Sequence, residues 1–178
     1  GDILYNGDKM TFIDTSFLHV PKPSAYMKPD RLSFNLGANE GRVLPELRRV
    51  AKRKDPVILV GDLNVAPLEN DVWSHKQLLN IVSHTPVETH LLGQAQAAFD
   101  WIDSTRHFIP PNKKIYSWWS YRAADWQAVN KGRRLDHIWV TPPLKDRIAG
   151  VEVLIDVRHW QPPSDHVPVY VDLAIDPK

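Results

Sequence analysis

The sequence predicts a mixed α/β fold in a single domain, with β-strands predominating in the second half of the chain. Three observations predict it. The 178 residues are 43% hydrophobic, so the chain has the size and composition of one ordinary domain with a buried core. Apolar residues recur at helical spacing in some segments and form short or alternating runs in others. No internal repeat, low-complexity tract or linker interrupts the chain, so we expect residues 1–178 to form one unit.

The first third is expected to hold a strand, a loop and a helix. Residues 9–20 read as a strand that prolines end, and residues 22–38, with scattered Pro, Asn and Gly, read as a loop. Residues 40–54 predict a helix because their apolar side chains recur at helical spacing. We interpret the basic face of this helix as a solvated surface, with cations near the helix C-terminus, and not as a nucleic-acid patch.

The rest of the chain is expected to alternate between strands and helices. Residues 57–60 are wholly apolar, which is typical of a central strand covered on both faces. Helical spacing predicts helices at residues 71–82 and 89–99. Short or alternating apolar runs predict four later strands, at residues 115–121, 135–140, 151–155 and 167–173.

The composition excludes several classes of function. There is no cysteine, which excludes disulfides, zinc-thiolate sites and thiol nucleophiles and leaves a cytoplasmic location as the default expectation. We find no apolar run of membrane-spanning length and no leader, so no membrane partner is expected. The net charge is +1, so any contact with nucleic acid has to come from local basic patches.

Three short strings that border apolar runs concentrate the polar chemistry. Gly61-Asp62-Leu63-Asn64 follows the strand expected at residues 57–60, and one intervening residue would place Asp62 and Asn64 on one face of an extended segment. An acid can then take a proton from water while the amide donates to a phosphate oxygen. The alternative is a simple turn, in which both side chains bond their own backbone.

The other two strings are Arg134-Leu135-Asp136-His137 and Pro163-Ser164-Asp165-His166. Adjacent residues of a strand face opposite sides, so we favour Asp136 as the functional member and interpret His137 as packed or exposed. Asp165-His166 alone would indicate a local turn, but Asp136 is available to fix the tautomer of the imidazole. Three carboxylates, an imidazole and an amide together are suited to splitting a phosphodiester with a divalent metal.

An aromatic and basic segment completes the candidate site. Residues 116–122 interleave Trp118 and Arg122 with other rings, and Arg133 and Arg134 follow. Rings can stack on exposed bases and sugars, while cations meet phosphates. Alternation would place Trp118 and Trp119 on opposite faces, so at least one of them is expected in the core.

Four strings resemble the exonuclease III family of the endonuclease/exonuclease/phosphatase superfamily. Several spaced strings agree between residues 57 and 173, which makes the resemblance specific. The strings are Gly61-Asp62-Leu63-Asn64-Val65-Ala66-Pro67, Tyr116-Ser117-Trp118-Trp119-Ser120-Tyr121-Arg122, Arg134-Leu135-Asp136-His137 and Pro163-Ser164-Asp165-His166-Val167-Pro168.

The resemblance implies a four-layered α/β sandwich, of two mixed sheets packed face to face with helices outside, and here a partial one. It also implies Mg²⁺-dependent cleavage of duplex DNA beside abasic sites and 3′-to-5′ trimming of its ends. Asp62 would activate the water, Asn64 and His166 would bind the phosphate, and Asp136 would orient His166. Asp165 would lie at the metal with Asp62, and Trp118 would form a wall against the abasic sugar.

The sequence also departs from the family pattern. No Gln-Glu pair, whose Glu is the family's main metal ligand, occurs in the 178 residues. In Leu18-His19-Val20-Pro21, His19 stands where the family has a phosphate-contacting Tyr. The chain is therefore expected to start inside the family fold; alternatively, Asn35 is the family's opening Asn and the chain is internally deleted.

These departures leave three functions open. The leading hypothesis is a metal-dependent DNA repair nuclease, weakened by the lost Glu, with Mg²⁺ as cofactor and Mn²⁺ as a substitute. The alternatives are a phosphatase acting on small phosphoesters and a non-catalytic DNA-binding remnant. Loss of covering strands would also leave an apolar sheet face, so self-association is expected.

Overall fold

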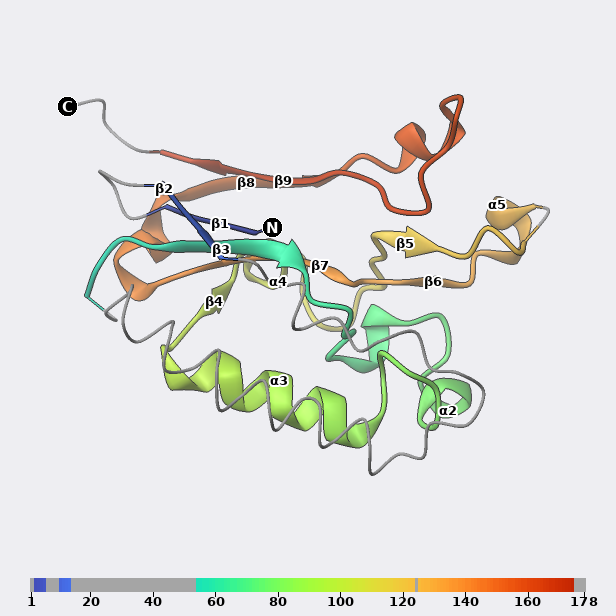
Figure 1. The fold of residues 1–178 in the computed structure, drawn as a ribbon, viewed down its shortest axis with the longest axis horizontal. Coiled ribbons are helices and arrows are strands. Elements are labelled where there is room, and N and C mark those ends of the chain that lie inside the picture. Colours follow the sequence, from blue (N-terminus) through green and yellow to red (C-terminus); the bar gives the residue numbers. More distant parts are fainter. Residues whose placement is uncertain (1, 6–9, 14–53, 124, 175–178) are drawn as a thin grey trace.

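The computed structural model describes residues 2–5, 10–13, 54–123 and 125–174, which form a mixed α/β fold with antiparallel sheets (Figure 1). The predicted fold class is thereby confirmed. Three expectations fall outside the described residues: the loop at residues 22–38, the helix at residues 40–54 apart from its last residue, and the roles of His19 and Asn35.

A five-stranded sheet with the order β2-β1-β3-β7-β4 forms the centre of the fold. The strand predicted at residues 57–60 is β3 (Ile58–Asp62), which lies between β1 (Asp2–Tyr5) and β7 (Asp136–Val140). The outer strands are β2 (Met10–Ile13) and the short β4 (Ile102–Asp103). The apolar run thus became a central strand, as its composition indicated.

A second, two-stranded sheet packs on one face of this central sheet. It pairs β8 (Ile148–Val153) with β9 (Val169–Leu173), and both strands fall within or near their predicted ranges. The buried side chains of Val140, Leu144 and Ile148 hold the two sheets together. Figure 1 shows β8 and β9 on one side of β3 and β7, and helix α3 on the other side.

Helix α3 (Pro86–Ala98) begins earlier than predicted because its N-terminus is strongly capped. The side chain of Thr85 accepts a hydrogen bond from the backbone N–H of Glu88, and the Glu88 carboxylate accepts one from the N–H of Thr85. Proline follows directly at Pro86, where its missing N–H costs nothing. A helix, the central sheet and the second sheet make three layers among the described residues; the fourth layer stays a prediction.

The prediction of a helix at residues 71–82 is wrong for most of that range. The structure has a 3₁₀ turn, η2 (Glu69–Asp71), and one helical turn, α2 (His75–Leu78). The segment between them runs beside β6 (Gly132–Arg133), where Val72 bridges Arg133 and the N–H of Trp73 donates to the carbonyl of Gly132. Asp71 is fully buried against two arginines, and this pairing overrides the local helical spacing.

The strand predicted at residues 115–121 is only two residues long. It is β5 (Trp118–Trp119), which pairs with β6. Its alternation is as expected, because Trp119 is 3% exposed in the core and Trp118 is half-buried at the surface.

The remaining elements are short: α4 (Ser104–Phe108), α5 (Trp126–Val129), η3 (Pro142–Arg147) and η4 (Ile155–His159). Among the described residues, none of the helices combines the length and apolar character that crossing a membrane requires.

Gly132 sits where β6 crosses the buried ring of Tyr116, and we expect Gly132→Ala to destabilise the protein. A Cβ at this position would lie 2.5 Å from Cγ of Tyr116. Tyr116 packs against Trp119 and Val167, so it has no room to retreat. Overpacking of this kind costs about 1–3 kcal/mol of unfolding free energy.

Urea unfolding monitored by circular dichroism measures this effect. Gly93→Ala in α3 is the control, because no atom lies within 4 Å of its added Cβ and alanine favours a helix over glycine by up to about 1 kcal/mol. Equal stability of the two variants would contradict the close approach at Gly132.

Candidate active site

Two carboxylates face each other across neighbouring strands of the central sheet. In the antiparallel pairing of β3 with β7, Asp62 is directly opposite Asp136. Directly opposed residues of an antiparallel pair project to the same face of the sheet. The same phase includes Ile58 and Val140, which pack toward β8 and β9, so both carboxylates lie on the face that the second sheet covers.

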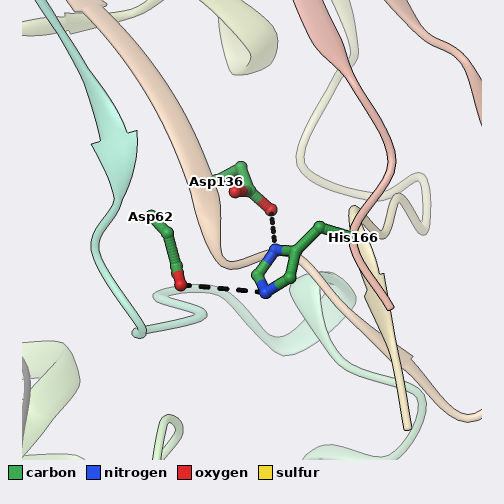
Figure 2. Close-up of side chains that lie close together, drawn as sticks. All are labelled: Asp62, Asp136 and His166. Carbon is green, nitrogen blue, oxygen red and sulfur yellow. Dashed lines mark hydrogen bonds and ion pairs between the residues drawn. The ribbon is translucent and has the colours of Figure 1, made fainter. Parts of the chain in front are cut away.

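An imidazole from the segment that precedes β9 lies between these carboxylates (Figure 2). Nδ1 of His166 is 2.9 Å from Oδ2 of Asp136, and Nε2 of His166 is 3.8 Å from Oδ2 of Asp62. His166 precedes β9 in the chain, while the aspartates end β3 and begin β7. Three segments far apart in sequence therefore meet in one cluster.

Strand β5 holds His166 in place. The N–H of Val167 donates to the carbonyl of Ser117, and the N–H of Trp119 donates to the carbonyl of Asp165. The buried hydroxyl of Ser117 in turn accepts from the N–H of Asp136. The aromatic segment thus ties the loop of His166 to the start of β7, a positioning role that the sequence analysis did not predict.

The cluster stabilises the charged form of its imidazole. Burial lowers the pKa of His166, but the hydrogen bond to Asp136 and the charges of Asp136, Asp62 and Asp165 outweigh it, so the pKa lies above its ordinary value. Two like charges directly opposite each other would destabilise the strand pair. The raised pKa of His166 favours an imidazolium, whose charge offsets that repulsion, with Nδ1 facing Asp136 and Nε2 facing Asp62.

Asn64 lies beside Asp62, but not for the predicted reason. Its backbone is left-handed, with φ of 56°, and not extended. Its N–H donates to Oδ1 of Asp62 at 3.0 Å, which is the local turn contact that we kept as the alternative. Both residues nevertheless line the same cleft. The turn that Asn64 forms with Asp62 is therefore part of the candidate site.

Asp165 lies near the cluster but is engaged elsewhere. Its Oδ2 accepts a hydrogen bond from Nε1 of Trp118 at 3.0 Å. Among the described residues, the carboxylates and imidazole whose ligand atoms gather within 4.8 Å of one another are those of Asp62, Asp136 and His166. A metal role for Asp165 therefore stays a prediction.

The donor set of this cluster fits a divalent cation. Carboxylate oxygens are the ligands that hard cations such as Mg²⁺ prefer, and a softer imidazole nitrogen also suits Mn²⁺. Asp62 and Asp136 supply such oxygens on one face of the sheet, and Asp165 lies on the same cleft. The carboxylate oxygens present therefore fit a hard divalent cation.

The cluster opens into a cleft of about 910 Å³. Its walls carry three of the predicted DNA-binding residues, Trp118, Arg122 and Arg133. Arg133 stacks over Trp118 at 5.3 Å from the ring centroid, and Lys131 stacks over Trp73 at 4.6 Å. Trp73 also lines the cleft, a role that the helical spacing of residues 71–82 did not indicate.

Arg134 is a correction to the predicted DNA-binding set. Its side chain is 1% exposed, and its guanidinium binds Asp71 at 2.7 Å and Asp103 at 2.8 Å. A guanidinium committed to two buried carboxylates cannot reach a phosphate, so the prediction for Arg134 is wrong.

Comparison with known proteins assigns the family. A sequence model described as the Endonuclease/Exonuclease/phosphatase family matches residues 33–166. An exodeoxyribonuclease of Bacillus subtilis (strain 168) is 38% identical over 124 residues, which are 69% of this chain and 46% of that protein. Exodeoxyribonuclease III of Haemophilus influenzae is 29% identical over 134 residues, which are 71% of this chain and 49% of that protein.

Among solved structures, an AP endonuclease from Archaeoglobus fulgidus superposes with a TM-score of 0.72 at 28% identity, over 80% of this chain and 54% of that one. The chain therefore spans about half the length of the relatives that it matches. The family match and these relatives confirm the resemblance to exonuclease III, and the chain belongs to the Endonuclease/Exonuclease/phosphatase family.

Proposed function

We propose that the chain is a metal-dependent nuclease that hydrolyses a phosphodiester of duplex DNA beside abasic sites and at 3′ ends. The observation that carries this proposal is the imidazole of His166 between the opposed carboxylates of Asp62 and Asp136. Asp62 and His166 line a cleft together with aromatic rings and cations. The relatives named as exodeoxyribonucleases and as an AP endonuclease support the choice of substrate.

Each residue then has a role that its position permits. Asp62 takes the proton of the attacking water, because its carboxylate lies in the cleft beside Nε2 of His166. His166 donates from Nε2 to the scissile phosphate, while Asp136 fixes its orientation through Nδ1. The amide of Asn64 donates to the same phosphate. The cationic side chains of Arg122 and Arg133 bind the flanking phosphates.

A bound divalent cation would neutralise charge on the phosphate, and Asp62 and Asp165 would hold it. We propose Mg²⁺, with Mn²⁺ as a substitute. Since the described cluster contains two carboxylates and an imidazole, half-maximal activity should need more metal than a site with a further carboxylate would. Mn²⁺ should support activity better than Mg²⁺, following the general affinity order. A cytoplasmic location and self-association through an apolar sheet face stay predictions.

A cleavage assay with three substrates tests the proposal. An abasic-site duplex, the matching undamaged duplex with a recessed 3′ end, and a small aryl phosphate are each incubated with Mg²⁺ or Mn²⁺. Incision of the first and trimming of the second support the nuclease. Hydrolysis of the aryl phosphate alone would identify a small-molecule phosphatase, and binding of DNA without cleavage at any metal concentration would identify a non-catalytic remnant.

Trp118 is expected to govern the choice of substrate more than the chemistry. Its ring lines the cleft beside Arg133, and stacking on an exposed base or sugar is worth about 1–3 kcal/mol. Trp118→Ala should therefore weaken binding to the abasic duplex on that scale and change binding to undamaged duplex less. Fluorescence anisotropy with both duplexes, in Ca²⁺ to prevent cleavage, measures it.

A second variant separates stacking from the hydrogen bond to Asp165. Trp118→Phe keeps an aromatic face but removes the Nε1 donor that bonds Asp165. It should bind the abasic duplex nearly as well as the wild type. If Trp118→Phe lost as much affinity as Trp118→Ala, the ring would act by orienting Asp165 and the stacking role would be wrong.

A further inference from the structure

The backbone that follows Asn64 is held by two buried histidines. The carbonyl of Val65 lies 2.8 Å from Nε2 of His137, and the carbonyl of Ala66 lies 2.6 Å from Nδ1 of His84. These two carbonyls are consecutive, and they come directly after Asp62-Leu63-Asn64 in the chain. His137 and His84 are each 2% exposed and belong to different segments of the protein.

A carbonyl oxygen only accepts hydrogen bonds, so the ring nitrogen that faces it has to carry a proton. In a neutral imidazole the other ring nitrogen is then an acceptor, and its partner can confirm the tautomer. In His137, Nδ1 lies 3.2 Å from Nη1 of Arg134, and a guanidinium nitrogen can only donate. Nδ1 is therefore the acceptor, and Nε2 carries the proton toward Val65.

The tautomer of His84 is fixed by a second histidine. Its Nδ1 donates to Ala66, so Nε2 is the acceptor, and it lies 2.8 Å from Nδ1 of His75. His75 must then donate from Nδ1, and its Nε2 lies 3.7 Å from Oε1 of Glu69 near the surface. Burial lowers the pKa of His84, which disfavours a second proton on its ring. The order of protons from His75 to Ala66 follows from these contacts.

This anchoring bears on Asn64 because its backbone is left-handed, with φ of 56°. Asparagine tolerates this conformation better than other residues that have a Cβ, but it also adopts the extended and right-handed regions readily, so contacts on both sides select the left-handed form. Before Asn64, the sheet pairing of Asp62 and the N–H of Leu63, which donates to Leu135, fix the chain. After Asn64, the N–H of Ala66 donates to Ser83, and the two histidines hold the carbonyls.

We propose that His84 and His137 are positioning residues that hold Asp62 and Asn64 in their active arrangement by binding the next two backbone carbonyls, and that His75 secures the tautomer of His84. This inference rests on the proposed function for its consequence in catalysis. Without either histidine, Asn64 can leave its left-handed conformation. Its N–H then no longer supports Oδ1 of Asp62, and the base and the phosphate-binding amide shift together.

Two substitutions at His84 separate positioning from packing. Asparagine places an amide N–H about where Nδ1 of histidine lies, so His84→Asn can still donate to Ala66. His84→Leu fills the buried space but donates nothing. Since a shift of about 1 Å in a catalytic group can cost 10²-fold in rate, kcat should fall by about that factor in His84→Leu, with a smaller change in KM. His84→Asn should regain most of the loss.

Packing alone predicts the reverse order, because leucine suits a buried site better than asparagine does. His90→Leu is the matched control, since His90 is exposed on α3 and should leave kcat unchanged. Thermal unfolding of every variant shows whether the fold survives. If His84→Leu matched the wild type in kcat while His84→Asn lost activity, the positioning role would be overturned.

A readout without catalysis keeps this inference separate from the proposed function. Long-range ¹H–¹⁵N spectra of the wild type near pH 7 report the tautomers, and we expect Nδ1–H at His84 and Nε2–H at His137. Hydrogen exchange of the Asn64 amide should speed up by at least tenfold in His84→Leu and return toward the wild-type rate in His84→Asn.

If the wild-type chain shows these tautomers and this exchange pattern but has no nuclease activity, the proposed function is ruled out, while the anchoring of the backbone by His84 and His137 still holds. Opposite tautomers, or exchange at Asn64 that is the same in all three proteins, would overturn the anchoring even if the chain proved to be a nuclease.

Discussion

Asp62→Asn is expected to lower the rate of DNA cleavage by about 10²- to 10⁴-fold, the usual cost of losing a general base. The substitution keeps the shape of the side chain and an oxygen that can accept the hydrogen bond from the N–H of Asn64. It removes only the negative charge and the basicity. The loss should therefore appear in kcat, measured on an abasic-site duplex under single-turnover conditions.

The stability of this variant should separate a chemical defect from a folding defect. Asp62 is directly opposite Asp136, so removing its charge relieves a like-charge pair while also removing one partner of His166. These effects oppose each other, and we expect little change in Tm. Wild-type turnover by Asp62→Asn would exclude Asp62 as the general base, and the cluster would then lack the group that activates the attacking water.

Asp71→Asn is expected to destabilise the protein by about 3–5 kcal/mol, the cost of breaking a buried ion pair by removing one partner. The Asp71 carboxylate is fully buried. Its Oδ1 accepts from Arg106 and Arg134, and its Oδ2 accepts from Arg134 and from the N–H of Leu68. The variant leaves two buried guanidinium groups with fewer anionic partners. Urea unfolding at pH 7 measures the change, with exposed Asp146→Asn as the control.

The same pair predicts a pH dependence. Burial raises the pKa of Asp71, but its hydrogen bonds and charge interactions with Arg134 and Arg106 outweigh that and hold the pKa below its ordinary value. A carboxylate with a lowered folded-state pKa contributes stability above the unfolded value of 3.8 and loses it as pH falls through the folded pKa. The stability difference between wild type and Asp71→Asn should therefore shrink below pH 3.8. A difference that stayed constant down to pH 2 would contradict the ion pair.

The sequence predicted those elements whose signal is local. The apolar run at residues 57–60 became β3, and the largely apolar segment at residues 135–140 became its neighbour β7. Residues 71–82 did not become a long helix, because Asp71 is paired with Arg134 and the backbone after it bonds to β6. Such contacts join residues about 60 positions apart along the chain and have no local pattern.

The candidate site was found residue by residue, but its arrangement was not. Motifs indicated Asp62, Asp136 and His166, whereas the opposed register of β3 and β7 comes from strand pairing, which the sequence does not specify. Arg134 was misassigned because its basic neighbours outweighed a buried partner far along the chain. His137 was correctly set apart from Asp136 by strand phase, but its bond to Val65 could not be foreseen.

The most direct test of the account is a double-mutant cycle between Asp136 and His166, whose side chains are 2.9 Å apart. Single-turnover rates on an abasic-site duplex are measured for the wild type, Asp136→Ala, His166→Ala and the double variant. If Asp136 acts only by orienting the imidazole and supporting its charge, the double variant should be little slower than His166→Ala alone. Independent, multiplicative losses would show that the two side chains do not act as a unit, and would contradict the cluster on which the proposed function rests.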